Sequence, residues 1–333
     1  MASRFFLFAL AATSVLAAPH TAVHKRQACT NPKQRKAWHK MTNEEKKAYL
    51  DAEVCLMNTP AEQEMRGAET VFDELQSIHV NIAQIAHFVG AFLPFHRYFM
   101  WAHEHKLETI CGYTGGQPYW EESLDAGNFS KSEIFDAEFG FGGDGVGTER
   151  CVTDGPFAGY MNNLGPGYEI NKHCINRRIS DFASQPAVQS NVDTCLRATS
   201  YTQAWNCIEG QPHGAGHGGV GEQMMNPISS PGDPLFYMHH TWLDKIWWDW
   251  QARDLETRLT AIGGNNEMNP AFANGLFGNR PDDLPVPEVK GDPGSTTTLT
   301  HIIEMYGVVP DVTIADVMDP SGMLCFEYID FRD

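Results

Sequence analysis

The stretch Asp233–Trp250, DPLFYMHHTWLDKIWWDW, decides the fold of this chain. Its first residue is a favourable N-cap and Pro234 suits the first helical position, so the stretch predicts a helix. At about 100° per residue, His240 and Asp244 share one face of this helix, whereas His239 points elsewhere. A histidine followed one turn later by a carboxylate is an arrangement that orients a metal ligand. A single histidine of this kind is more typical of a packed core, so the metal interpretation depends on partners elsewhere in the chain.

Three histidines stand earlier, in the segment IHVNIAQIAHFVGAFLPFHRYFMWAHEHKLETICG (78–112): His79, His87 and His96. Pro94 can open a helix that Gly112 closes, which puts His96 in the first turn. His103 lies nearly on the same face but about 10 Å further along the axis. Packing or hydrogen bonding is therefore the better interpretation for His103.

A third segment, IEGQPHGAGHGGVGEQMMNP (208–227), places His213 and His217 four residues apart. If the segment is helical, both histidines lie on one face. Its interspersed glycines make it a poor helix by propensity, so something other than propensity must hold it. A bound metal ion would do so.

The rest of the chain predicts a mainly α fold with long irregular loops and a few short strands. Residues 35–58 are charged and helix-prone, with Thr42 and Glu45 in capping-box spacing. A second helix is expected to follow Pro60 and run toward His79. Residues 112–211 are rich in glycine, proline and asparagine and predict irregular structure. The expected strands are Thr296–Ile303 and Met323–Ile329.

Length and composition are those of a soluble globular protein of 333 residues. Residues 1–18 carry Arg4 and then an apolar run that ends in small residues, which predicts a secretory signal peptide and not a membrane span. Residues 19–26 end in Lys25-Arg26 and predict a short propeptide, so one domain is expected over 27–333. Residues 1–26 hold three basic and no acidic residues, so their removal changes the net charge from −18 to −21. This acidity argues against nucleic acid or anionic membrane as partners.

Eight cysteines remain after residue 26, and an even number in a secreted chain predicts disulfides, although about 105 pairings are open. None of them forms a CxxC motif, which argues against a zinc or redox motif. Asn128 begins the sequon Asn-Phe-Ser and is a candidate glycosylation site. We expect a secreted protein that is a monomer or a weak dimer.

The six histidines form two triples: His79, His87, His96 and His213, His217, His240. Imidazole ligands without carboxylates favour zinc or copper over magnesium or calcium. A mononuclear catalytic zinc needs only three protein ligands, so two complete triples indicate a pair of ions with exchangeable positions between them.

The sequence resembles the tyrosinase and catechol oxidase family of type-3 dicopper proteins, to which the haemocyanins are related. The matching motifs are FLPFHRYF (92–99) with His87 nine residues before His96, PYW (118–120), PHGAGH (212–217) and DPLFYMHHTWLDKIW (233–247). The resemblance implies a four-helix core in which the first triple binds copper A and the second binds copper B. It also implies that His239 is the non-ligand histidine of the HH pair.

The same resemblance assigns roles beside the coppers. Glu209 matches the acid that holds an ordered water near the metals, although it could also be a plain helix N-terminal charge. Gly214 and Gly218 follow His213 and His217, at positions where members with strong monophenol hydroxylation often carry Asn or Asp after the first histidine. Pro227 matches the gate position, and Met225 lies close to it. Asp244 either orients a ligand or pairs with Arg97.

Two departures narrow the type of member. No cysteine lies between Cys55 and Cys111, so the local thioether link to the second copper A histidine is absent, and a link from Cys55 is doubtful. Only 83 residues follow Trp250, which resembles the short secreted fungal type without a lid domain.

The leading hypothesis is a copper oxidase that uses O2 to convert small phenolic substrates, chiefly o-diphenols, to o-quinones. This hypothesis includes o-aminophenols as further substrates and a weak activity on monophenols. The alternatives are an oxidase that tailors one phenolic natural product and a haemocyanin-like O2-binding protein.

Overall fold

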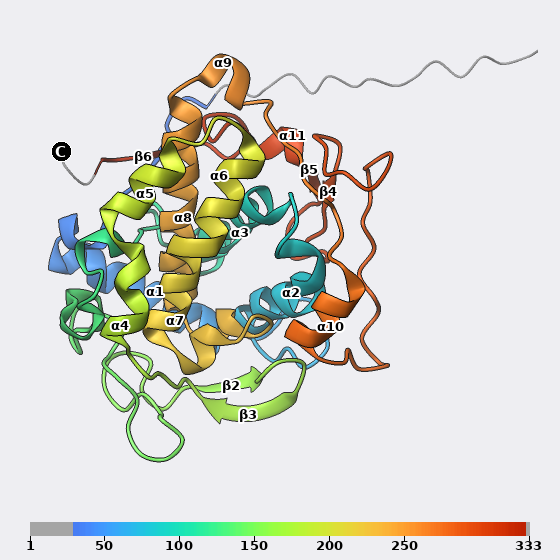
Figure 1. The fold of residues 1–333 in the computed structure, drawn as a ribbon. Helices are drawn as coiled ribbons and strands as arrows, with labels where there is room; N and C mark the ends of the chain where they lie inside the picture. The colour runs from blue at the N-terminus through green and yellow to red at the C-terminus, as the bar shows by residue number, and fades with distance from the viewer. Residues whose placement is uncertain (1–28, 331–333) are drawn as a thin grey trace, which may run out of the picture.

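The computed structural model describes residues 29–330, so the predicted signal peptide and propeptide (1–26) lie outside the described residues. Helices predominate, and long loops connect them (Figure 1). The mainly α fold expected from the sequence is confirmed. The helices of the described part are α1 (Asn43–Asn58), α2 (Val71–Ala86), α3 (Phe92–Cys111), α4 (Asp181–Ser184), α5 (Gln189–Leu196), α6 (Tyr201–Ile208), α7 (Gly214–Val220), α8 (Leu235–Ala252), α9 (Leu255–Arg258), α10 (Pro270–Phe277) and α11 (Ile314–Val317).

Local sequence signals set the ends of the first helices. Thr42 and Glu45 form the predicted capping box of α1. The helix expected after Pro60 begins later, at Val71, because Thr70 and Asp73 form a second capping box there. Residue 60 instead pairs with residue 70 as an isolated bridge, which makes 60–70 a loop. The apolar periodicity of this segment correctly predicts a helix, but the predicted start after Pro60 is wrong by about ten residues.

The stretch that decides the fold forms α8, which is buried along almost its whole length. The carboxylate of Asp233 accepts a hydrogen bond from the backbone N–H of Leu235 at 3.0 Å and pairs with buried Arg177. Helix α8 packs against α3, and α5 and α6 cover its other sides (Figure 1). The main hydrophobic core around these helices extends from Ala37 to Phe326.

A buried ion pair joins the two central helices and decides the role of Asp244. Arg97 of α3 donates from Nε to Asp244 Oδ1 at 2.6 Å, and its guanidinium lies over the ring of Trp247. The hydroxyl of Tyr328 donates to the other carboxylate oxygen. Asp244 therefore pairs with Arg97, and it ties the C-terminal strand to the helices below the histidines.

The strands are short, and all of those in the described part pair two by two. Strand β1 runs parallel to β6, whereas β2 with β3 and β4 with β5 are antiparallel. The strands expected at 296–303 and 323–329 are present, but each is reduced to two or three residues between turns. Their bounds are β1 (Lys33–Arg35), β2 (Met161–Leu164), β3 (Ile170–Cys174), β4 (Ile302–Ile303), β5 (Val312–Thr313) and β6 (Phe326–Tyr328).

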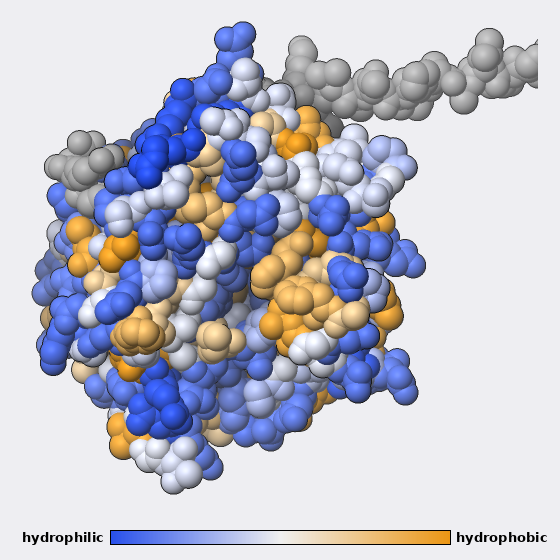
Figure 2. All heavy atoms as spheres, viewed as in Figure 1, coloured by the Kyte–Doolittle hydropathy of each residue, from blue (hydrophilic) through white to orange (hydrophobic). Residues whose placement is uncertain are grey.

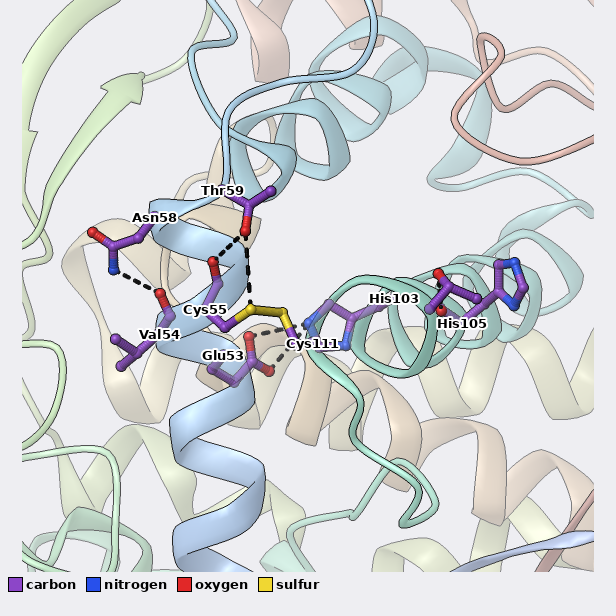
Figure 3. Close-up of a disulfide and its surroundings, with 9 residues drawn as sticks. Glu53, Val54, Cys55, Asn58, Thr59, His103, His105 and Cys111 are labelled. Carbon is purple, nitrogen blue, oxygen red and sulfur yellow. Dashed lines mark hydrogen bonds and ion pairs between the residues drawn. A yellow bond between two sulfur atoms is a disulfide. The ribbon is translucent and has the colours of Figure 1, made fainter.

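All eight cysteines form disulfides: Cys29–Cys325, Cys55–Cys111, Cys151–Cys174 and Cys195–Cys207. The second bridge fastens the end of α1 to the end of α3, and the link from Cys55 to a histidine is therefore excluded (Figure 3). Beside this bridge, His103 is hydrogen-bonded to Gln117 and Glu53, as expected for a structural histidine. Asn128, the candidate glycosylation site, is exposed.

Among the described helices, none combines the length and the apolar character that a membrane crossing requires.

Candidate metal centre

Two groups of histidines meet in the interior, and together they contain all six histidines singled out from the sequence. His79, His87 and His96 come from α2, from the residue that ends α2 and from α3. In this first group the potential ligand nitrogens lie within 4.8 Å of one another. The second group meets the same limit and consists of His213, His217, His239 and His240.

The two groups are neighbours. The rings of His96 and His240 stack with centroids 4.1 Å apart, and the rings of His87 and His213 are 6.0 Å apart. Nε2 of His217 is 3.3 Å from Nε2 of His240. The helices thus bring two sets of imidazoles, far apart in the sequence, into one buried centre.

Backbone carbonyls fix the tautomer of five of these imidazoles. Nδ1 donates to the carbonyl four residues earlier in three of them: His87, His96 and His213. Nδ1 of His79 donates to Ile228, and Nδ1 of His217 donates to Met224. An Nδ1–H held in this way leaves the Nε2 lone pair free for a metal ion.

The free nitrogens are buried and lack partners. Nε2 of His79, His96 and His213 is inaccessible to solvent and makes no hydrogen bond with the protein. Buried polar atoms without partners are costly and therefore call for an explanation. Burial also lowers the pKa of all six imidazoles, to about 4 for His87, so they stay neutral. Neutral nitrogen donors gathered in two adjacent groups fit a pair of copper or zinc ions.

The loop that follows α7 connects both groups. Its Met224 carbonyl orients His217 of the second group, and its Ile228 carbonyl orients His79 of the first. In the sequence, Pro227 lies between Met224 and Ile228. The family resemblance makes it the gate residue, and it is half-buried, whereas the nearby Met225 is exposed. Sequence reasoning missed this orienting role because it rests on backbone atoms.

His239 lies closer to the centre than helix counting predicts. Its ring is 4.7 Å from that of His217, and its Nδ1 is 2.6 Å from Oε1 of buried Glu122. Gly216 makes this position possible, because a Cβ at Gly216 would lie under 3.0 Å from Nδ1 of His239. The close approach of α7 to α8 therefore places a fourth imidazole in the second group.

The partner of His239 indicates why it differs from the other histidines. Burial raises the pKa of Glu122 well above its usual value and lowers that of His239 to about 3, so both groups favour their uncharged forms. Oε2 of Glu122 and Nε2 of His239 are also buried, and neither makes a hydrogen bond with the protein. His239 is thus held through Nδ1 by a side-chain carboxyl group, whereas backbone carbonyls hold five of the other six histidines. Glu122 itself was not identified from the sequence.

Glu209 lies beside the first group and is almost fully buried. One of its oxygens accepts the backbone N–H of Phe88 at 2.7 Å, and the other accepts Nε1–H of Trp205 at 2.6 Å. Burial raises its pKa to about 8. Because Phe88 directly follows His87, the Glu209 side chain holds the end of α2 in place.

The part of the centre that lies closest to solvent is the start of α7. His213 is only half-buried, Gly214 is exposed, and a Cβ at Gly214 would meet nothing within 4 Å. At Gly218 the nearest atoms to such a Cβ are Cβ of Ala183 at 3.6 Å and Sδ of Met225 at 4.0 Å. Figure 2 shows the surface hollowed between the side of α4 and α7 and the side of α10.

Comparisons with known proteins agree with this geometry. The family model "Common central domain of tyrosinase" matches residues 69–253, more than half of the chain. The tyrosinase ustQ of Aspergillus flavus is 32% identical over 314 residues, which cover 90% of this chain and 80% of that protein.

Solved structures share the fold. A glycine-to-asparagine variant of a polyphenol oxidase from Thermothelomyces thermophila superposes with a TM-score of 0.75 at 25% sequence identity. The match covers 90% of this chain and 89% of that protein. A functional unit of octopus hemocyanin has a TM-score of 0.55 at 18% identity, covers 90% of this chain and 68% of its own, and shows a likeness of fold alone. With the family model, the similar tyrosinase and the two neighbouring histidine groups in agreement, this chain belongs to the tyrosinase family of copper-binding oxidases.

Proposed function

We propose that this chain is a secreted oxidase that uses O2 to convert o-diphenols to o-quinones. In this proposal two copper ions are its cofactors, o-aminophenols are further substrates, and monophenols react weakly. A bound copper pair would supply the redox chemistry, the transfer of two electrons from each diphenol to O2, so that two diphenols are oxidised for each O2 reduced to water.

The proposed ligands are His79, His87 and His96 for one copper and His213, His217 and His240 for the other. The observation that carries this assignment is the common orientation of five imidazoles, each held through Nδ1 by a backbone carbonyl. An all-imidazole ligand set carries no charge of its own. The site could therefore hold copper in either oxidation state without leaving a buried negative charge unpaired.

The protein's own part in the reaction is to position the phenol and receive its protons. The exposed approach over Gly214 admits the ring toward His213, and Gly218 keeps the next turn of α7 free of a side chain. We propose that Glu209 holds a water with the lone pairs that its two protein donors leave unused. Pro227 and Met225 limit the approach from the loop side.

Monophenols pose an added demand, because a phenol with a pKa near 10 must lose its proton before hydroxylation. A water on Glu209 alone is a weak base for this step, and Gly214 gives that water no second acceptor. Diphenol oxidation should therefore exceed monophenol hydroxylation.

Two other functions are compatible with the fold. An oxidase that tailors one phenolic natural product is favoured by the exposed apolar side chains beside the hollow, which suit a substrate larger than catechol. A haemocyanin-like O2-binding protein would share the fold, but the hollow between the side of α4 and α7 and the side of α10 offers substrates a route that an O2 carrier does not need.

Copper analysis with O2-uptake assays on catechol, tyrosol and o-aminophenol tests the proposal. We expect two coppers per chain and O2 uptake that is fastest on catechol. One zinc per chain, or copper without O2 uptake on any of the three, would contradict the oxidase. Slow turnover on all three with fast turnover on one larger phenol would favour the tailoring enzyme.

A further inference from the structure

Phe88, the residue after His87, has an unusual backbone and an unusual exposure. Its φ is 55°, in the left-handed region that costs free energy for any residue with a Cβ and that glycine or asparagine occupies more readily. Its side chain is 44% exposed, so burial does not compensate for that cost. Strained residues of this kind cluster at ligand-binding sites, where the surrounding structure holds them. Here the hydrogen bond from the Phe88 N–H to Glu209 does so.

Helix α10 presents a second aromatic side chain to Phe88. Phe272 is 50% exposed, and its ring meets that of Phe88 edge to face with centroids 5.2 Å apart. Leu276, one turn further along α10, is 39% exposed and extends the same face. The neighbouring face of α10, about 100° around the helix, packs onto α2 through Ala273 and Phe277. We call the three exposed side chains Phe88, Phe272 and Leu276 the aromatic rim.

The aromatic rim is continuous with the metal centre. Phe277 of α10 lies with its ring centroid 6.2 Å from that of His87, and Phe88 is the next residue of the chain after this histidine. In Figure 2 an apolar patch lies over α10 and the segment between α2 and α3, at the edge of the hollow. A molecule that reached the histidines from the hollow would pass along this patch.

We propose that the aromatic rim binds the part of the substrate that does not react, and that the substrate class is phenols carrying a second aromatic ring. This inference rests on the proposed function and narrows it. Two aromatic rings in edge-to-face contact leave ring faces and edges open to a third ring, and such contacts depend on geometry as well as on apolar area. The uncharged rim, on a chain of net charge −18, suits a neutral substituent better than an anionic one.

The test compares two o-diphenols that differ only by the second ring, 4-methylcatechol and 4-benzylcatechol. The variants are Phe272→Ala, Phe88→Asn, which tolerates the left-handed backbone and keeps the N–H for Glu209, and Phe182→Ala. Phe182 lies on α4, across the hollow, and is 81% exposed, so it is the matched phenylalanine for comparison.

We expect Phe272→Ala and Phe88→Asn to lower the ratio of kcat/KM for 4-benzylcatechol over 4-methylcatechol about three- to tenfold, the range for loss of one aromatic contact. The change should fall on KM. Phe182→Ala should leave that ratio unchanged. A ratio that does not move in the rim variants, or that falls as far in Phe182→Ala, would overturn the assignment.

A binding measurement separates this inference from the proposed function. Calorimetric titration with 4-benzylresorcinol and resorcinol, which lack adjacent hydroxyls, should show tighter binding of the benzyl compound and loss of that preference in Phe272→Ala. If the wild-type protein takes up no O2 with either catechol, the oxidase proposal fails. The binding preference still tests whether the aromatic rim binds a second ring. A wild-type dimer that Phe272→Ala converts to monomer, with the binding preference unchanged, would mean that a second copy covers the rim and would refute it as a substrate site.

Discussion

Replacing Gly216 by alanine should destabilise the protein, although alanine is the better helix former. Alanine in place of glycine inside a helix is worth about 1 kcal/mol in its favour. At Gly216, however, the new methyl group would lie under 3.0 Å from Nδ1 of His239 and 2.7 Å from Oε2 of Glu122. Both partners are fully buried and fixed to each other, so neither can move freely. Overpacking of this kind costs about 1–3 kcal/mol, and because neither partner can yield we expect the upper part of that range, about 2–3 kcal/mol. Less the gain of about 1 kcal/mol in helix propensity, this leaves a net loss of about 1–2 kcal/mol.

The same helix supplies the controls. At Gly218 the nearest atom to an added methyl group is 3.6 Å away, and at Gly214 nothing lies within 4 Å. Alanine at either position should therefore leave stability unchanged or raise it by up to about 1 kcal/mol. For a chain of this size, a loss of about 1–2 kcal/mol corresponds to a fall in Tm of roughly 1.5–3 °C.

The assay is thermal unfolding of the copper-free proteins, followed by copper content after reloading. Copper-free protein isolates the packing term, because bound metal would add its own stabilisation. Gly216→Ala should also retain less copper, since the displaced His239 ring lies 4.7 Å from that of His217. A Tm for Gly216→Ala equal to or above that of Gly218→Ala would refute the view that α7 needs glycine here to admit the His239–Glu122 pair.

Four further predictions concern the metal, Glu209, the disulfides and Gly214. His240→Ala should lose one copper and the activity while His239→Ala keeps both coppers; equal copper loss would mean that the ligand in the HH pair is misassigned. Glu209→Gln should lower stability by about 1–3 kcal/mol, because an amide has one acceptor oxygen for the donors of Phe88 and Trp205, and an unchanged Tm would contradict this. Reduction should lower Tm markedly, at about 2–4 kcal/mol for each disulfide, and thiol counting before reduction should find none free. Gly214→Asn should raise tyrosol hydroxylation relative to catechol oxidation; a wild-type enzyme that turns over both equally would show that this residue does not decide.

Much of the helical core could be predicted because its signals are local. The capping box at Thr42 and Glu45, the glycine that ends α3 and the histidine spacing in 212–217 each depend on residues within one or two turns. The predicted start of α2 is wrong because the capping box of Thr70 and Asp73, which begins ten residues after Pro60, outweighs the weak signal of the proline. Disulfide pairing could not be predicted, since Cys29 pairs with Cys325 across 296 residues and no local rule selects that partner.

Local signals likewise predict one part of the candidate site and miss another, and Glu209 shows why. Its residue type and its place four residues before His213 suggest a carboxylate near the metals, and both are local facts. The use of that carboxylate is set by a donor 121 residues away, the N–H of Phe88, which takes one of its oxygens, while Trp205 takes the other. His239 repeats the pattern, since its role depends on Glu122, 117 residues earlier, and on the space left by Gly216.

In both cases a residue that motif reasoning treats as acting alone is one half of a buried pair. Such a pair costs more to break than to form, because the remaining member is left buried without its partner. Substitutions at Glu209 or Glu122 should therefore disturb the position of His87 or His239 before they change any proton transfer, and stability must be measured alongside activity to separate the two effects.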